Sequence, residues 1–331
     1  MDKRKHRDNG QQTLHKKRKM TLAEFRENEM PLLSGAVSFC NNLPMSLYAD
    51  TTVVKSPEVV FRGLVLSHNH LLGEEFLLNF RRSQAEIGIL VGTNNYTVPT
   101  VVAAVAQRDL EEDESDLISL PPFANLREPI GPLIRSRRSI RRYSGNPISL
   151  KDLSTLLFHA AGISGHSDVQ ISPEPLAVTE DAHLDLRVAA SGGALYPVDL
   201  CVIAINVAQL APGAYRYLPK HHALKPVGRP GALEDVKKMA QFHEIEIEKS
   251  SFMAVYVYKH FENARKYGDS ALGFAFIESG AMAAHTHLVC TALGFGSCDV
   301  GNYSKRQFER ILDVDGVSGH VIHLTVVGRT N

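Results

Sequence analysis

Lys266 and Tyr267 are the two side chains of this sequence that are best suited to proton transfer. They stand together in the run Arg265-Lys266-Tyr267-Gly268, shortly after an apolar stretch at Phe252 to Tyr258 that predicts a strand. Burial or a neighbouring cation lowers the pKa of a lysine, so its neutral amine becomes available as a base. On an exposed surface the same pair would have no chemical role, and the sequence alone leaves both interpretations open.

A dense group of arginines offers a second kind of chemistry, the binding of an anion. Five arginines lie between Arg135 and Arg142, in a run that also contains Ser136 and Ser139. A guanidinium group matches the oxygens of a phosphate two at a time, and a serine hydroxyl adds a further donor. The cluster is therefore a candidate phosphate site, although a basic surface or a nucleic-acid patch would have the same composition.

Two glycine-containing segments would let the backbone approach a flat ligand closely. Ser191-Gly192-Gly193-Ala194-Leu195 comes just before a predicted buried strand at Asp199 to Val207. Gly294-Phe295-Gly296-Ser297-Cys298 follows a predicted long helix, Leu272 to Leu293, which is rich in small residues. Glycine has no Cβ, and its N–H group can face a ligand. A tight turn and a glycine helix stop explain the two segments equally well.

The elements that must position these segments are strands separated by helices, without a strict strand–helix–strand rhythm. Ser149 and Asp152 predict a capping box at the start of a helix, and His320 to Val327 predicts a final strand. This pattern indicates an α+β fold. An acidic stretch followed by Pro121, Pro122 and Pro129 predicts a linker ahead of this part of the chain.

Charge and composition divide the chain into three parts and exclude several function classes. The 331 residues carry 36 basic and 36 acidic side chains, yet the first 19 residues hold eight bases against two acids. That segment has no aromatic residue for base stacking and no apolar core of a secretory signal. We predict a basic disordered tail at 1–20, a region of unknown role at 21–125, and a folded domain at 126–331.

Other absences in the sequence narrow the function further. No apolar run approaches the ~20 residues of a membrane span, and no dinucleotide, P-loop, hydrolase or zinc-protease motif is present. Four scattered cysteines without a CxxC pair agree with a reducing cytoplasm. The spacing of the fifteen histidines disfavours a metal site. We expect a cytoplasmic protein with no metal, no membrane segment and no nucleic-acid partner.

Taken together and in this order, the segments resemble the flavin-dependent nitroreductase superfamily. Within it they resemble the SagB-type (McbC-like) azoline dehydrogenases of ribosomal peptide natural-product clusters. The resemblance covers about residues 131–328, and its signatures are SRRSIRRYS, ASGGALYP, Lys266-Tyr267-Gly268, Glu278-Ser279-Gly280 and ALGFGSC. It implies a central, mostly antiparallel sheet flanked by helices, in an intertwined homodimer with FMN at the interface.

The same resemblance implies roles for individual residues. The FMN phosphate and ribityl chain would lie against Arg137, Arg138, Ser139 and Arg141, with a late contact from Arg329. Lys266 would be the general base, and Tyr267 would orient it or relay a proton. The flavin ring would lie against two backbone segments, the first from the partner subunit; these contain Ser191, Gly192, Gly193, Ala194, Leu195, Gly294, Gly296 and Ser297.

The implied reaction is the oxidation of a thiazoline or oxazoline in a precursor peptide to the azole, with hydride transfer to flavin N5. The implied partners are the precursor peptide, a cyclodehydratase and other subunits of a maturation complex. The sequence departs from the family pattern at Ser270, Leu272, Gly273, Ala281, Ala284 and His285, which replace polar residues near the active-site helix. This departure favours a divergent substrate. An NAD(P)H-dependent nitro or quinone reductase and a non-catalytic peptide-binding subunit are the alternatives.

Overall fold

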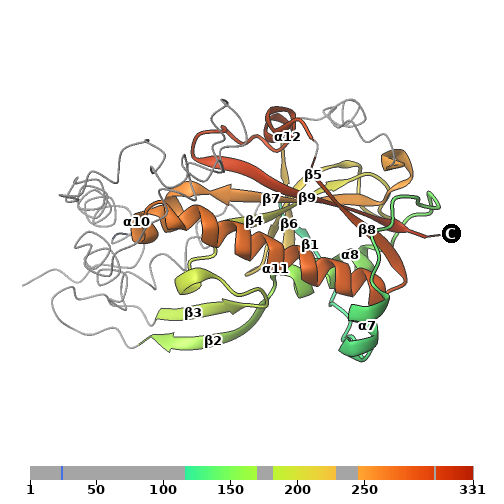
Figure 1. Ribbon diagram of the computed structural model, residues 1–331, viewed down its shortest axis with the longest axis horizontal. Coiled ribbons are helices and arrows are strands. Elements are labelled where there is room, and N and C mark those ends of the chain that lie inside the picture. Colours follow the sequence, from blue (N-terminus) through green and yellow to red (C-terminus); the bar gives the residue numbers. More distant parts are fainter. Residues whose placement is uncertain (1–23, 25–115, 170–181, 229–244, 302, 331) are drawn as a thin grey trace, which may run out of the picture.

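The computed structural model describes Glu24 and residues 116–169, 182–228, 245–301 and 303–330. The predicted tail at 1–20 and nearly all of the region at 21–125 lie outside these residues. A seven-stranded sheet in the order β1-β6-β5-β4-β7-β9-β8 forms the centre (Figure 1). Its strands are β1 (Ile118–Ser119), β4 (Val198–Ala204), β5 (Gly213–Leu218), β6 (Ala223–Val227), β7 (Phe252–Lys259), β8 (Phe295–Val300) and β9 (Gly319–Arg329).

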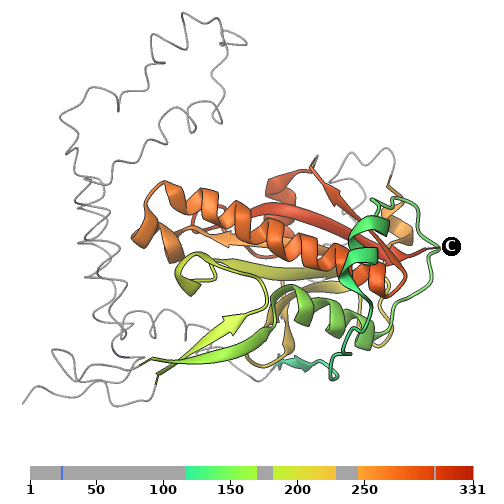
Figure 2. The ribbon, with the colours of Figure 1, turned by 60° about the horizontal axis from the view of Figure 1, so that its bottom comes forward.

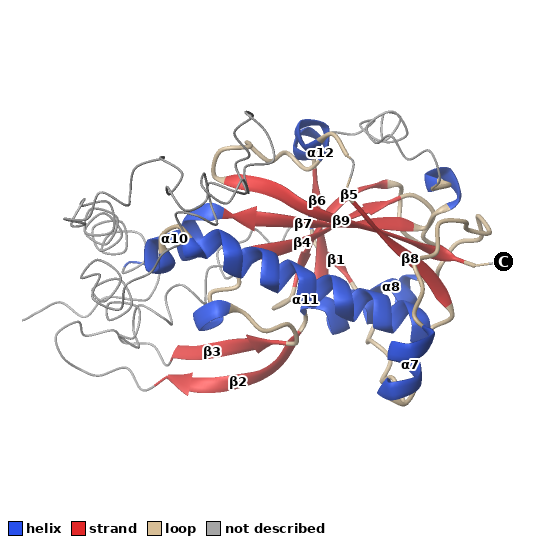
Figure 3. Cartoon of the chain, in the orientation of Figure 1, coloured by secondary structure: helices blue, strands red, loops and turns tan. Residues whose placement is uncertain are grey.

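Every pairing between these strands is antiparallel in the described part of the chain. Strands β2 (Ile163–Val169) and β3 (Ala182–Arg187) form a separate antiparallel ribbon beside the main sheet (Figure 3). The expected fold class, an α+β fold around a mostly antiparallel sheet flanked by helices, is thereby confirmed.

Helices cover both faces of the sheet because alternate residues of its central strands point to opposite sides. On β7, Phe252, Ala254 and Tyr256 pack with helices α8 (Leu150–Ala161) and α11 (Ser270–Ala292). Met253 and Val255, between them, pack with helix α12 (Lys305–Ile311) on the other face. Both faces are buried, so β7 reads as a continuous apolar run rather than as an alternating one.

The capping box that the sequence predicted lies at the start of α8. Ser149 accepts a hydrogen bond from the backbone N–H of Asp152, and the Asp152 carboxylate accepts one from the Ser149 N–H, at 3.2 Å. Gly162 follows the last turn. This reciprocal capping box satisfies two backbone donors that the first turn of a helix leaves without partners.

Strand β1 lies ahead of the domain start that we predicted at residue 126. Ile118 and Ser119 pair with Leu224 and Ala223 of β6 and form an edge of the main sheet. A strand of two residues is too short to show periodicity, and the prolines at 121 and 122 directly after it suggested a linker. The folded sheet therefore begins inside the stretch that composition had marked as a connection.

Helix α11 is a long helix with different elements packed at its two ends. Its 23 residues span about 34 Å at 1.5 Å per residue. The short helix α10 (His260–Tyr267) precedes its N-terminal end, and β8 begins just after its C-terminal end. Helix α7 (Ile130–Ser136) lies beside the C-terminal part of α11 (Figure 2).

Candidate functional site

Lys266 lies in the last turn of α10, and its side chain is turned into the protein. The residue is only 7% exposed, and burial lowers the pKa of its amine. The Nζ atom lies 5.1 Å from the centre of the Tyr267 ring, and burial raises the pKa of that phenol. The structure therefore provides the condition under which the lysine can act as a base, which the sequence had left open.

The segment from Ser191 to Tyr196 forms a tight turn with an unusual backbone. Three of its residues have positive φ angles: Gly193 at 64°, Ala194 at 53° and Tyr196 at 47°. Positive φ is uncommon for residues other than glycine and is retained only where the surroundings enforce it. Here the Ser191 hydroxyl accepts a hydrogen bond from the N–H of Tyr196, at 3.0 Å.

The glycine turn and the lysine meet in the same protomer. A Cβ atom added to Gly193 would lie 2.6 Å from Nζ of Lys266 and 2.6 Å from the hydroxyl of Tyr267. Gly193 itself is exposed, while Lys266 behind it is buried. A flat molecule that lies on the Gly193 backbone would therefore be close to the lysine amine, and any side chain at position 193 would push the amine away.

The other two segments meet at the opposite end of α11. Ser139 and Ser297 form a parallel β-bridge, and the N–H of Ile140 donates to the carbonyl oxygen of Ser297 at 2.9 Å. A Cβ atom on Gly296 would lie 2.7 Å from the Ile140 side chain. Gly296 is thus required for the arginine run to approach β8 this closely.

Positive charge gathers around the beginning of β8. Burial raises the pKa of the Cys298 thiol, and the charges of Arg141 and Arg137 act against that rise. Arg329, at the end of β9, lies over the Phe295 ring at 5.5 Å. Arg138 behaves differently, because its Nη1 donates to the carbonyl oxygens of Arg135 and Arg137 at 2.8 Å. Three of the four predicted arginines therefore converge on β8.

These groups fit the phosphate end of a flavin mononucleotide. Guanidinium groups from the post-α7 segment and from β9, with the hydroxyl of Ser139, supply charge and directional donors to an anion. The side-chain-free Gly193 turn suits a flat ring. Residues that would hold the cofactor are Arg137, Ser139, Arg141 and Arg329 at the phosphate, and Ser191 to Leu195 and Gly294 to Ser297 along the ring.

The predicted residues fall into two groups at different levels of α11. Lys266, Tyr267 and the Ser191–Leu195 turn lie toward its N-terminal end, where Gly192 packs against Phe274. Ser139, Arg141, Gly294, Ser297 and Arg329 lie toward its C-terminal end, where Ser297 bonds His287, 13 residues or about 20 Å further along the helix. The structure places each group together and separates the two groups from each other.

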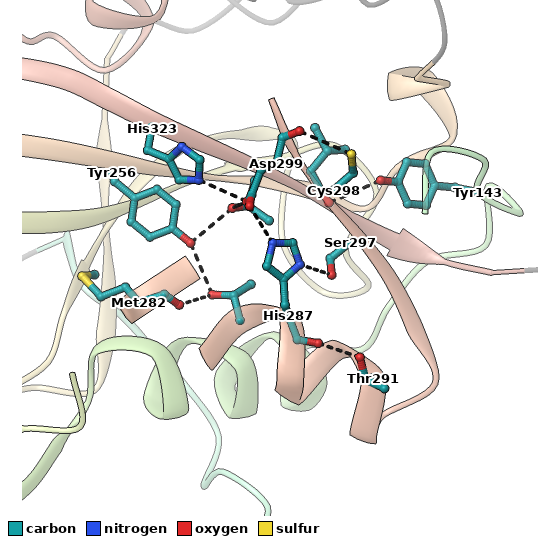
Figure 4. Close-up of polar contacts among 12 residues, drawn as sticks. Tyr143, Tyr256, Met282, His287, Thr291, Ser297, Cys298, Asp299 and His323 are labelled. Carbon is teal, nitrogen blue, oxygen red and sulfur yellow. Dashed lines mark hydrogen bonds and ion pairs between the residues drawn. The ribbon is translucent and has the colours of Figure 1, made fainter. Parts of the chain in front are cut away.

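Several polar residues at the site were not predicted as functional. His287, Asp299 and His323 form a hydrogen-bonded group behind Ser297 (Figure 4). Glu278, 2% exposed on α11, accepts from the N–H of Val198 at 3.2 Å, just after the glycine turn. The position of Asp299, directly after the GFGSC segment, was the available sequence signal. Its partners lie on other elements, and spacing does not identify them.

Comparison with known proteins gives the family. The nitroreductase family model matches residues 134–329, so the chain belongs to the nitroreductase family. A Methanocaldococcus jannaschii protein provisionally named a nitroreductase is 26% identical over 202 residues, covering 60% of this chain and 89% of its own. The family accounts for the oxidoreductase class.

Two solved structures are also similar. A structure from Ralstonia eutropha JMP134, again provisionally named a nitroreductase, has a TM-score of 0.50 and 23% identity and covers 66% of this chain and 92% of its own. An Escherichia coli structure of the microcin synthetase McbBCD complex with truncated pro-MccB17 bound has a TM-score of 0.46 and 18% identity. It covers 95% of this chain and 99% of the matched chain.

Two absences concern the described residues alone. None of the helices there is both long and apolar enough to cross a membrane. Among the same residues, no group of three or more histidine, cysteine or acidic side chains is placed to hold a metal ion.

Proposed function

We propose that this nitroreductase-family protein is an FMN-dependent dehydrogenase. It would oxidise an azoline, or a related modified residue of a ribosomal precursor peptide, to the azole or dehydro product. The observation that carries the proposal is the Lys266 amine, which is buried, has a lowered pKa, and lies directly behind the Gly193 backbone. Hydride transfer alone needs no such base, whereas aromatisation of a ring requires the loss of a proton as well.

The proposed roles of the residues follow from their positions at the two ends of α11. Lys266 would accept one ring proton, and Tyr267, beside it, would orient the amine or relay that proton. With a proton lost to Lys266 and a hydride lost to bound FMN, the substrate would lose two protons and two electrons in all, and molecular oxygen would regenerate the oxidised flavin. The arginine group would hold the phosphate and so fix the position of the ring.

We also propose that the active form is a homodimer, because the lysine and arginine groups lie about 20 Å apart along α11 in one chain, at the levels of Phe274 and His287. Helices α11 and α7 expose large apolar side chains: Phe276 is 51% exposed, Ile277 70%, Ile130 65% and Ile134 59%. Exposed apolar side chains of this kind mark contact surfaces. A second copy that covers these helices would bring the lysine end of one chain to the arginine end of the other.

A direct test begins with the purified full chain and oxidised FMN. We expect a visible flavin spectrum and, with a thiazoline-containing peptide under air, a mass loss of two hydrogen atoms. A protein that takes up no FMN would contradict the cofactor proposal. A flavoprotein that leaves thiazoline and oxazoline peptides unchanged would contradict the substrate proposal.

The second candidate is an NAD(P)H-dependent nitro or quinone reductase, which the name of the 26% identical M. jannaschii relative favours. It makes a different prediction for the bound cofactor. NAD(P)H would then bleach the flavin rapidly without oxygen, and a quinone would restore its colour. In the azoline dehydrogenase, by contrast, the thiazoline peptide would bleach the flavin and NAD(P)H would do so only slowly.

A further inference from the structure

A chain of hydrogen bonds leads from the protein surface to Ser297. Oδ2 of Asp299 lies 2.9 Å from Nε2 of His287, and Nδ1 of His287 lies 2.7 Å from Oγ of Ser297 (Figure 4). The Asp299 side chain is 45% exposed, whereas Ser297 is 2% exposed. Each nitrogen of the His287 ring therefore has its own polar partner, one at the surface and one in the interior.

The Asp299 carboxylate is held in place on its other oxygen as well. Oδ1 accepts from the hydroxyl of Thr325 at 2.7 Å and lies 3.1 Å from Nε2 of His323. Burial tends to raise the pKa of Asp299, but hydrogen bonds from His287, His323 and Thr325 outweigh it and hold that pKa well below its usual range. Asp299 is therefore an ionised group that only accepts hydrogen bonds at neutral pH.

An ionised acceptor at Nε2 determines the form of the neutral His287 ring. Nε2 must carry the proton that it donates to Asp299, and Nδ1 is then an acceptor. The Ser297 hydroxyl must in turn donate to Nδ1. Its oxygen keeps lone pairs for other donors.

A serine, a histidine and a carboxylate in this order can activate a serine nucleophile. The burial of Ser297 speaks against that role, because a substrate carbonyl cannot reach its oxygen. Ser297 instead belongs to the strand that the arginine segment joins, through its bridge with Ser139 and its carbonyl bond with Ile140. Ser297, His287 and Asp299 therefore support the part of β8 that the arginine segment joins. They do not react with a bond of the substrate.

We propose that Asp299 is a positioning residue, which acts through the Nε2–H form of His287 to fix the direction of the Ser297 hydroxyl beside the arginine group. The proposal rests on the proposed function only in that FMN is the ligand whose binding would report the hydroxyl. The hydrogen-bond order itself is a property of the chain without a ligand.

The first test measures the His287 ring in the full chain without FMN, labelled with ¹⁵N-histidine, by long-range ¹H–¹⁵N correlation near neutral pH. The signal of His287 is the one that disappears in His287→Gln. Once the pH is raised until the ring is neutral, we expect the Nε2–H tautomer in the natural protein and a growing share of the Nδ1–H form in Asp299→Leu, which has no acceptor. His323→Gln, which touches only the other carboxylate oxygen, should leave the His287 tautomer unchanged. A neutral Nδ1–H ring in the natural protein, or an unchanged ring in Asp299→Leu, would overturn the proposal.

The second test uses FMN affinity in a double-mutant cycle, after circular dichroism has shown that each variant is folded. Asp299→Leu and Ser297→Ala should each weaken FMN binding about fivefold, because each removes one hydrogen bond that holds Ser297, and with it the part of β8 that the arginine segment joins, in place. In the Ser297→Ala background Asp299→Leu should have no further effect, and two independent, additive losses would contradict the proposal. If the natural protein binds no FMN, the proposed function fails, while the ring measurement still decides the role of Asp299.

Discussion

The two ends of α11 differ in almost every physical property. At the N-terminal end a single amine, Lys266, is buried behind a side-chain-free turn, and burial lowers its pKa. At the C-terminal end the guanidinium groups of Arg141 and Arg329 are exposed beside β8. In our proposal the first end holds an amine that burial makes less basic, and the second end binds the cofactor phosphate.

In our proposal this difference lets one fold combine a general base with a separate phosphate-binding site. Arginines close to Lys266 would favour the neutral amine. Their charges would also attract an anionic ligand to the lysine end of α11. The part of α11 from Phe274 to His287, about 20 Å long, separates the two groups within one chain. A second copy can then bring the two ends together at one cofactor while each end keeps its own environment.

The largest effect should follow the removal of the base at the lysine end. Lys266→Met keeps the length of the side chain but no titratable group, so the rate of azoline oxidation should fall by about 10²- to 10⁴-fold. The FMN dissociation constant should stay within about twofold, because the proposed phosphate site lies toward the other end of α11. Peptide mass spectrometry and flavin titration measure the two quantities.

The control is Lys249→Met, which removes a lysine whose side chain is 51% exposed in an ion pair with Glu246. Its oxidation rate should be unchanged. In the natural protein the rate should rise with pH and level off below the ordinary lysine pKa, because burial favours the neutral amine. Equal oxidation rates for Lys266→Met and the natural protein would contradict the role of Lys266 as the general base.

A somewhat smaller loss should follow Gly193→Ala, which tests whether the turn and the lysine act as a unit. The new Cβ would lie 2.6 Å from the amine and would have to form at a φ of 64°. We expect oxidation to slow by about 10- to 100-fold, since small misplacements of catalytic groups have effects of this size. Gly165→Ala, where no atom lies within 4 Å, should change nothing. If Gly193→Ala oxidises the peptide at the natural rate, the turn only reverses the direction of the chain and does not position the lysine.

At the arginine end, Arg141→Gln should weaken FMN binding about tenfold, because it removes a charge-assisted contact with the phosphate. The remaining binding should depend less on salt than that of the natural protein. Arg306→Gln, on the exposed side of α12, is the matched control and should bind FMN normally. If both variants lose FMN affinity equally, the net charge of the protein explains the binding, and Arg141 is not part of a specific site.

The smallest effect concerns stability and has the opposite sign. Because the folded state disfavours the protonated Lys266 amine, it binds fewer protons than the unfolded state between the lowered and the ordinary pKa, and its stability rises with pH there. Below that window the cost of protonating a buried amine is fully present. Lys266→Met should therefore raise the thermal midpoint near neutral pH by about 1–3 °C. A lower midpoint would indicate that the amine is there for stability.

Local chemistry was predictable from the sequence, and long-range pairing was not. The runs around Arg137, Gly193, Lys266 and Ser297 could be recognised because each is continuous in the chain. That Gly193 packs on Lys266, and Ser139 on Ser297, depends on how the sheet and α11 bring distant segments together. The His287–Asp299–His323 group escaped prediction for the same reason, since its members come from α11, β8 and β9.

In the proposed dimer one cofactor contacts the arginine end of one chain and the lysine end of the other. A crystal structure of the full chain grown with FMN is the direct test. We expect a dimer in which the phosphate contacts Arg137, Arg141 and Arg329 of one copy, while the flavin ring lies on Gly193 and near Lys266 of its partner. A flavin whose phosphate and ring both contact a single copy, or a phosphate bound away from β8, would contradict it.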